Sequence, residues 1–219
     1  MKKLALVMAM LMLSTCGLTG CGVINNNNNN TVEGKDKTKT ETVYGEYPKF
    51  DGDLSKRSCS PVLSIGNTTA KAGGTATVTV SVSGADGKWS SCGLHLVYPE
   101  TLSIVTKDGG TTVVREDGDA TGAAMATIMK EWLHENKTAI LLNNKLNSSF
   151  YTAIFAGDEG KDGDIVTFYL KIPPDAVSGT VYPVEFLYIE GDLFTNIAKE
   201  KEMQQFAFTH YINGTITVE

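Results

Sequence analysis

The sequence predicts an all-β domain, a sandwich or a barrel. The segment Thr75 to Val82 alternates small polar with apolar side chains, which is the pattern of a strand with one wet and one buried face. Short β-rich runs recur along the chain, and Gly, Asp and Pro turn residues separate them. These runs are Val62 to Ile65, Cys92 to Tyr98, Leu102 to Lys107, Ala139 to Leu142, Phe150 to Ala156, Ile165 to Ile172, Val181 to Ile189 and Gly214 to Val218. Such spacing is typical of sandwiches and barrels.

Two segments break this pattern and are predicted to be short helices. Ala120 to Glu135 has apolar residues, among them Ile128 and Trp132, at helical spacing. Phe194 to Phe206 is rich in Ala, Lys, Glu, Met and Gln. We expect both apolar stripes to pack on the core across an end of the sandwich.

The amino terminus has the residue order of a secretory signal peptide. Lys2 and Lys3 precede an uncharged run from Leu4 to Leu13, and this basic-then-apolar order is typical of an export signal. The run is well below the roughly 20 residues that a membrane-spanning helix needs, and no later stretch is long and apolar enough. We therefore expect export without a transmembrane helix.

A candidate lipid attachment site follows the apolar run. Leu18-Thr19-Gly20-Cys21 resembles the bacterial lipobox, in which small residues let a peptidase cleave before an acylated cysteine. Residues 1–20 are then the lipoprotein signal peptide and Cys21 carries the lipid. Cys16 is the weaker candidate because the bulkier Thr15 precedes it. Several acyl chains anchor firmly, since each buried methylene adds about 0.8 kcal/mol, so we expect the protein on the extracellular face of the cell membrane.

The remaining chain divides into a tether and one domain. Residues 21–58 contain six consecutive asparagines and then a Thr/Lys/Glu-rich stretch with few apolar side chains. Such a segment cannot bury enough apolar surface to offset the conformational entropy that ordering costs, so the composition predicts a flexible spacer. Residues 59–219 have the size of one ordinary domain with its own core.

The net charge disfavours nucleic acid as a partner. The chain has 19 basic and 25 acidic residues, a net charge of −6, and loss of Lys2 and Lys3 with the leader leaves 17 against 25, or −8. This excess of carboxylates would be repelled by phosphate backbones.

The sequence lacks the residue patterns of catalysis and metal binding. It has three histidines, at positions 95, 134 and 210, and no HExxH, CxxC or GxSxG pattern. Acidic clusters at Asp117/Asp119 and within residues 158–164 lack the spacing of an EF-hand, and we interpret them as turns between strands. We expect no enzymatic activity, no metal and no cofactor.

Two cysteines remain after the lipid site. Cys92 occupies an inward position of its alternating strand, which predicts a buried structural thiol rather than a nucleophile. A bridge between Cys59 and Cys92 is an open alternative, because pairing depends on their Cα separation.

The order of the β-rich pieces resembles the cohesin family over residues 61–219. The first half of the resemblance is Val62-Leu63-Ser64-Ile65-Gly66, Ala72-Gly73-Gly74-Thr75, Gly93-Leu94-His95-Leu96-Val97-Tyr98-Pro99 and Leu102-Ser103-Ile104-Val105. The second half is Phe150-Tyr151-Thr152-Ala153-Ile154-Phe155-Ala156 with its acidic-Gly turn, Gly163 to Ile172, Gly179-Thr180-Val181-Tyr182-Pro183-Val184 and Asn213 to Val218.

The resemblance implies a nine-stranded jelly-roll β-sandwich that binds dockerins. Dockerins are calcium-containing modules appended to plant-cell-wall-degrading enzymes and scaffold proteins, so the calcium belongs to the partner. This chain departs from cohesins of the first type in its two inserted helices. It also has Ser91 and Gly93 at positions where those cohesins tend to carry polar or acidic contact residues. In these respects it resembles the divergent cohesins of rumen-type cellulosomes.

The resemblance also places a partner-binding face on this chain. If Cys92, Leu94, Leu96 and Tyr98 point to the core, alternation sends the other side chains of that strand outward. The family's sixth strand and following turn extend the face, and its fifth strand adds Leu142 or a neighbour. The candidate contact residues are Ser91, Gly93, His95, Val97, Leu142, Thr152, Ile154, Gly157 and Gly160. For His95, an inert surface histidine is the alternative interpretation.

Two functions are consistent with these patterns. The first is a cell-surface cohesin that recruits a dockerin-bearing enzyme or scaffold protein. The second is a carbohydrate-binding module or substrate-capturing lipoprotein on a similar sandwich, since a fold does not fix a function. A sugar site needs coplanar exposed Trp or Tyr, whereas a dockerin site needs a flat mixed strand face.

Overall fold

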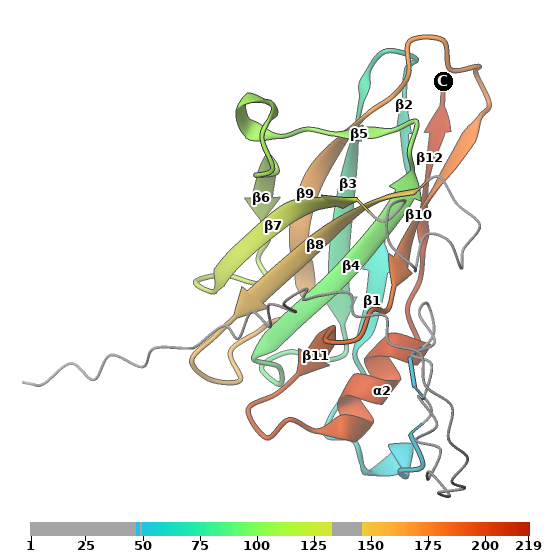
Figure 1. The fold of residues 1–219 in the computed structure, drawn as a ribbon. Coiled ribbons are helices and arrows are strands. Elements are labelled where there is room, and N and C mark those ends of the chain that lie inside the picture. The colour runs from blue at the N-terminus through green and yellow to red at the C-terminus, as the bar shows by residue number, and fades with distance from the viewer. Residues whose placement is uncertain (1–46, 49, 133–145) are drawn as a thin grey trace, which may run out of the picture. The chain divides into compact units, whose positions relative to one another are not determined.

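The described part of the chain is a β-sandwich of two sheets (Figure 1). The computed structural model describes residues 47–48, 50–132 and 146–219. The strands are β1 (Val62–Ile65), β2 (Thr68–Ala70), β3 (Thr75–Ser83), β4 (Ser91–Pro99), β5 (Ser103–Ile104), β6 (Arg115–Asp117), β7 (Met125–Trp132), β8 (Leu146–Ile154), β9 (Gly163–Lys171), β10 (Val181–Leu187), β11 (Leu193–Thr195) and β12 (Gly214–Val218). The helical elements are η1 (Leu54–Lys56), η2 (Lys107–Gly109) and α2 (Lys201–Thr209). The predicted all-β sandwich is confirmed.

The two sheets have different widths. One has the order β1-β3-β9-β5, with β6 also pairing with β9. The other has the order β2-β12-β10-β4-β8-β7, with β11 also pairing with β4. Only β2 and β12 pair in parallel among the described strands. All nine residues of β4 pair in unbroken register with β8, and β7 continues the sheet on the far side of β8.

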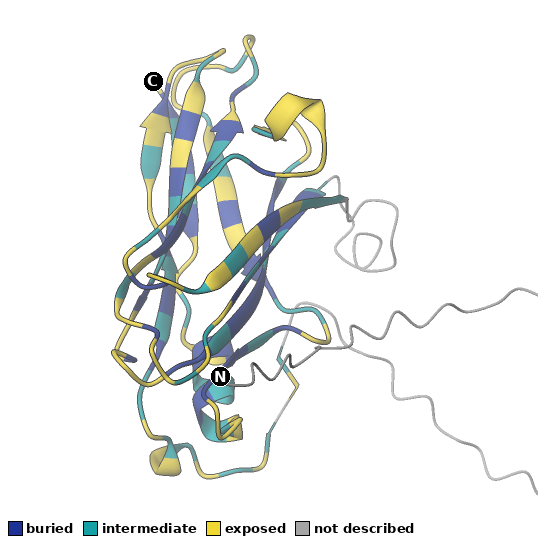
Figure 2. Cartoon of the chain, turned by 90° about the vertical axis from the view of Figure 1, so that its left-hand side faces the viewer, coloured by how far each residue is buried: buried dark blue, intermediate teal, exposed yellow. Residues whose placement is uncertain are grey.

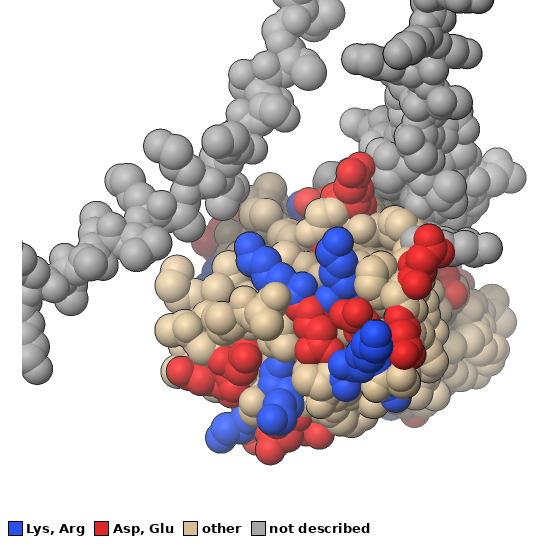
Figure 3. Space-filling view, turned by 90° about the horizontal axis from the view of Figure 1, so that it is seen from below, with Lys and Arg blue, Asp and Glu red and all other residues tan. Residues whose placement is uncertain are grey.

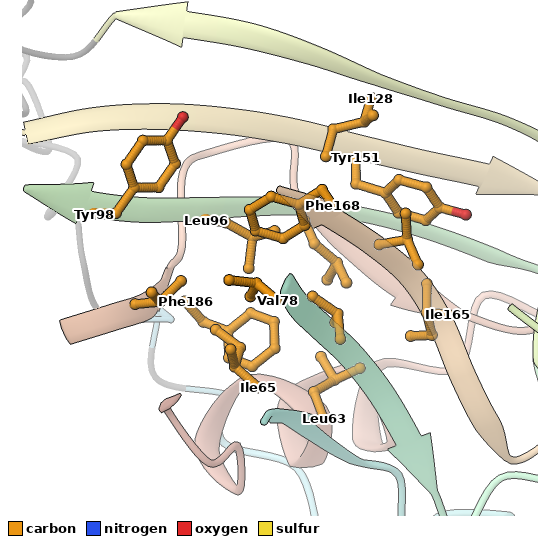
Figure 4. Close-up of a cluster of buried hydrophobic side chains, with 14 of the residues drawn as sticks. Leu63, Ile65, Val78, Leu96, Tyr98, Ile128, Tyr151, Ile165, Phe168 and Phe186 are labelled. Carbon is orange, nitrogen blue, oxygen red and sulfur yellow. The ribbon is translucent and has the colours of Figure 1, made fainter. Parts of the chain in front are cut away.

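The core lies between the sheets and follows the predicted alternation. Along β3 the apolar side chains are buried and the Thr and Ser side chains between them are exposed or half-buried, as the banded colours of Figure 2 show along the strands. In Figure 4, Leu96 and Tyr98 of β4 and Tyr151 of β8 share the core with Val78 and Phe168 of the other sheet. The predicted inward set on β4 is therefore correct.

The helix predicted over Ala120 to Glu135 is wrong for its described part. Residues 125–132 form strand β7, which pairs with β8 from Met125 opposite Ile154 to Trp132 opposite Asn147. The sequence Met-Ala-Thr-Ile-Met-Lys-Glu carries helix-forming residues, but pairing with a long neighbouring strand overrides such local preferences. Residues 133–135 lie outside the described residues, as does the strand expected at Ala139 to Leu142.

The second predicted helix begins later than expected. Leu193 to Thr195 pairs with β4 as β11, and Phe194 packs with its ring centroid 5.0 Å from that of Trp89. Two hydrogen bonds precede α2, which starts at Lys201: Asn196 Nδ2 donates to Glu200 Oε2, and the Glu200 N–H donates to Asn196 Oδ1. One α-helix is therefore present in the described residues, where two were predicted.

Part of the predicted tether packs against α2. The Tyr47 ring stacks on Phe208 at a centroid distance of 5.2 Å, and its hydroxyl accepts a hydrogen bond from Gln204 Nε2 at 2.9 Å. The Arg57 guanidinium lies 4.4 Å from the centroid of the Phe206 ring. The ordered fold thus includes residues before Cys59, where the sequence predicted the domain to begin.

Cys59 and Cys92 are free thiols. Cys92 is completely buried, and its burial raises the pKa of the thiol to about 12. Cys59 is half-buried and is not bonded to Cys92. The open alternative of a Cys59–Cys92 bridge is not what the structure contains. Within the described ranges, no helix is both long and apolar enough to cross a membrane.

The acidic loop after β8 caps backbone amides. Asp162 accepts hydrogen bonds from the N–H groups of Gly84 and Ala85, both at 2.8 Å, and Asp158 accepts one from Ile197 at 2.8 Å. No group of three or more potential metal ligands occurs among the residues that the structure describes. These contacts support the interpretation of the Asp residues as turn formers.

Removal of calcium should leave the melting temperature of a fragment of residues 47–219 unchanged, because these carboxylates are occupied by backbone N–H groups. Thermal unfolding followed by circular dichroism, with and without chelator, measures this. Asp162→Ala is the positive control and should cost about 1–3 kcal/mol, because it leaves two amides without their acceptor. A large drop in melting temperature on chelation would show that the loop binds calcium.

Candidate partner-binding face

Three neighbouring strands present one outer face of the larger sheet. Directly opposed residues of antiparallel strands lie on the same side of the sheet, so the register defines rows that run across β4, β8 and β7. The rows are Ser91–Ile154–Met125, Gly93–Thr152–Thr127, His95–Phe150–Met129 and Val97–Ser148–Glu131. The predicted residues of β4 and β8 are thus brought together on one face.

Strand β7 adds exposed apolar side chains to this face that the sequence did not predict. Met125 is 84% exposed and Met129 is 45% exposed, and both share the outer face with Ile154, which is 56% exposed. Exposed apolar side chains in one area of a surface are typical of a docking site. The signal in the sequence is weak, because the outward Met125, Thr127 and Met129 alternate with an inward Ala, Ile and Lys rather than with a run of buried apolar residues.

His95 is held between two carboxylates and is not a free contact residue. Its Nδ1 lies 2.7 Å from Asp192 Oδ1, its Nε2 lies 2.7 Å from Glu131 Oε2, and its ring centroid is 4.7 Å from that of Phe150. Burial alone would lower the pKa of His95, but hydrogen bonds and charges from Asp192 and Glu131 outweigh it and raise that pKa to about 9. The imidazolium therefore donates both N–H groups. We call Glu131, His95 and Asp192 the histidine clasp.

The end of the face near Val97 is closed. Val97 points away from the main core, as predicted, but it is only 4% exposed because it packs with Leu187, Leu146 and Ile189. A Cβ on Gly93 would meet the Phe150 ring at 3.4 Å, so Phe150 lies over this glycine. Gly93 and Val97, both predicted contact residues, are therefore buried in the structure.

The two glycines of the following turn have different roles. Gly157 is half-buried. Gly160 is buried rather than at the rim, because a Cβ there would lie 2.2 Å from the Trp89 ring. The Trp89 ring fills this space, so the role of Gly160 is to leave room for a buried core side chain. Leu142, the last predicted contact residue, lies outside the described residues.

A pocket of about 300 Å³ adjoins the Ser91 end of the face. Ser91, Leu193 and Thr195 lie on the outer face of β4 and β11, and residues of the following loop and α2 complete the walls. The lining residues are Ser90, Ser91, Leu193, Thr195, Asn196, Ile197, Lys199 and Gln204. At the end of the domain that carries α2 and η1, Figure 3 shows acidic and basic side chains interspersed on the surface that the described residues form.

The family model of the cohesin domain, which is compared with the amino-acid sequence, matches residues 61–216. The chain belongs to the cohesin family. No match was found among curated proteins.

Solved cohesins share the fold of this cohesin. A type III cohesin from the cell-surface anchoring scaffoldin ScaE of Ruminococcus flavefaciens is 28% identical, with a TM-score of 0.64, over 79% of this chain and 95% of that chain. The sixth cohesin of scaffoldin B from Acetivibrio cellulolyticus, solved with a Cel5 dockerin mutant, is 16% identical, with a TM-score of 0.53, over 73% and 99% of the two chains. A type I cohesin from a Clostridium thermocellum cohesin–dockerin complex is 14% identical, with a TM-score of 0.52, over 73% and 99%.

The histidine clasp should make the stability of this cohesin depend on pH. A folded pKa of about 9 for His95, against roughly 6.5 when unfolded, gives a stabilisation that is complete below pH 6.5 and is lost as the pH rises to 9. This difference corresponds to about 3 kcal/mol. The gap in unfolding free energy between wild type and His95→Gln should therefore be larger at pH 6 than at pH 9.5 by that order, as measured by urea unfolding.

The matched control is His210→Gln, because His210 is an exposed histidine whose ring stacks on Phe206. Its unfolding free energy should stay within about 0.5 kcal/mol of wild type, as is usual for surface substitutions. A gap for His95→Gln that does not change with pH would contradict the clasp.

Proposed function

We propose that this cohesin binds a dockerin through the outer face of β4, β8 and β7, and that a lipid on Cys21 holds it on the extracellular face of the cell membrane. Its role is then to recruit dockerin-bearing enzymes or scaffold proteins. The observation that carries the proposal is the group of exposed Met125, Met129 and Ile154 side chains on one sheet face.

The chemistry of this face suits a protein partner. Its exposed apolar side chains are flanked by Thr127 and Thr152, which are small and polar. Protein–protein interfaces combine an apolar centre with a polar rim and are enriched in Met. Two solved relatives are in complex with dockerins, which supports a dockerin as the partner.

The described residues favour binding over catalysis. Cys92 is fully buried with a pKa of about 12, so it is a thiol at physiological pH and has no access to a substrate. Both nitrogens of His95 are occupied by carboxylates, so its ring is not available as a proton acceptor. Trp89 is also fully buried and cannot stack on a sugar, which weighs against the carbohydrate-binding alternative.

A place at the cell surface is supported by two observations. The leader and Leu18-Thr19-Gly20-Cys21 have the order of a lipoprotein signal. The similar Ruminococcus flavefaciens cohesin comes from a cell-surface anchoring scaffoldin. Residues 1–46 lie outside the described residues, so the anchor needs a separate test.

Ile154→Arg should weaken dockerin binding by more than about thirtyfold, because a charge buried at the centre of an interface costs 2 kcal/mol or more. The probes are all dockerin modules encoded in the genome that carries this chain, each purified with calcium and titrated by calorimetry. Ile212→Arg is the control, because Ile212 has nearly the same exposure, 57% against 56%, but lies beside β1 of the other sheet. Binding of no dockerin, or equal affinity for Ile154→Arg and wild type, would contradict the proposal.

Cys21→Ala should release the protein from the membrane fraction into the medium, because the mature chain would lose its acyl chains. Immunoblots of fractionated cells measure this. The comparison variant is Cys16→Ala, which should remain with the membranes. The opposite result would mean that Cys16 carries the lipid.

A further inference from the structure

One row of residues on the outer face of β4, β8 and β7, here called the docking face, continues beyond β4 into the pocket. Thr195 of β11 pairs with Ser91, Ser91 pairs with Ile154, and Ile154 pairs with Met125. This row crosses four adjacent strands, with β11 at the α2 side in Figure 1. The pocket lined by Leu193 and Thr195 is therefore on the outer face of the sheet and is continuous with the exposed Ile154 and Met125.

The loop beyond the pocket is fixed by internal hydrogen bonds. Asn196 Nδ2 donates a hydrogen bond to the Glu200 carboxylate, and the Glu200 N–H donates one to Asn196 Oδ1. The Lys199 N–H donates a hydrogen bond to the Asn196 carbonyl at 2.9 Å. Asp158 accepts the Ile197 N–H. Lys199 has a φ of 55°, a conformation that is uncommon for a residue with a side chain. This bonding holds Ile197 at the pocket wall, with 57% of its surface exposed.

The other end of the same face offers little to a partner. The histidine clasp ties β4 to β7 and to the turn before β11, and Val97 is buried. Met125, Ile154 and Ile197 lie at the Ser91 end, and Met129 of the His95 row is less exposed than any of these three. A partner that follows β4 from Ser91 to Val97 would cover mostly closed surface, whereas a partner that crosses the strands would cover Met125, Ile154 and Ile197.

We propose that the dockerin crosses β7, β8 and β4 along the Ser91 row and inserts an apolar side chain into the pocket between β11 and α2. This inference rests on the proposed function. The lining contains Leu193 and Ile197 for an apolar anchor, and hot-spot side chains of interfaces commonly fill such small pockets. Lys199 is the charged residue of the lining. An acidic side chain or a free backbone carbonyl of the dockerin, next to its apolar anchor, would therefore pair best with the Lys199 ammonium group.

Ile197→Asp tests the pocket. It places a carboxylate at the apolar wall and should weaken binding of the cognate dockerin at least tenfold. Ile212→Asp is the matched control, because Ile212 is also 57% exposed and lies outside this face. It should bind as wild type does. The titrations use the full mature chain and the dockerin identified in the panel, and circular dichroism melts confirm that each variant is folded.

The outcomes separate this inference from the proposed function. Loss of binding by Ile197→Asp and by Ile154→Arg, with Ile212→Asp unchanged, supports a contact that extends into the pocket. If Ile197→Asp binds the dockerin with wild-type affinity while Ile154→Arg loses binding, the dockerin uses the docking face but not the pocket, and the pocket proposal is overturned. Wild-type affinity for both overturns the face and the pocket. Equal weakening by Ile197→Asp and Ile212→Asp also overturns the pocket, because the effect would then not depend on position.

Discussion

The unbroken antiparallel register between β4 and β8 is the constraint on which the rest of the site depends. It opposes nine residue pairs, from Ser91 with Ile154 to Pro99 with Leu146. Since side chains alternate along each strand, this one register decides which residues reach the core and which form the outer face. It also places β8 between β4 and β7, so that Glu131 of β7 reaches His95 of β4 across β8. A slip of β8 by one residue against β4 would send Tyr151 out of the core while Leu94 stayed in it.

The strands with strong alternation could be predicted from the sequence. The expected Thr75 to Val82 is β3 to within one residue, and the inward residues of β4 are those expected. The side chains of β3 alternate clearly in polarity, and those of β4 do so from Ser91 to Leu96, so the local pattern and the sandwich agree there. The outward positions of Thr152 and Ile154 follow from the same rule together with the cohesin resemblance.

What the sequence did not predict depends on contacts between distant segments. Strand β7 has helix-forming residues, and only its pairing with β8 makes it a strand. The partners of His95 lie 36 and 97 positions away along the chain, so no local pattern shows that its ring is occupied. Gly160 is excluded from the rim by Trp89, and five strands, β4 to β8, lie between these two residues in the sequence. Alternation predicts the direction of a side chain but not what covers it, and Val97 shows this difference most clearly.

On the proposed binding mode, a dockerin covers the outer face at its Ser91 end, from β7 to the pocket beside α2. Hydrogen–deuterium exchange of the mature chain, with and without a saturating cognate dockerin, measures which strands the dockerin covers. We expect slower exchange on binding in peptides from residues 125–132 and 193–199, with no change in β1 and β3 of the other sheet. Protection confined to β1, β3 or β9, with unchanged exchange in β7 and β11, would contradict it.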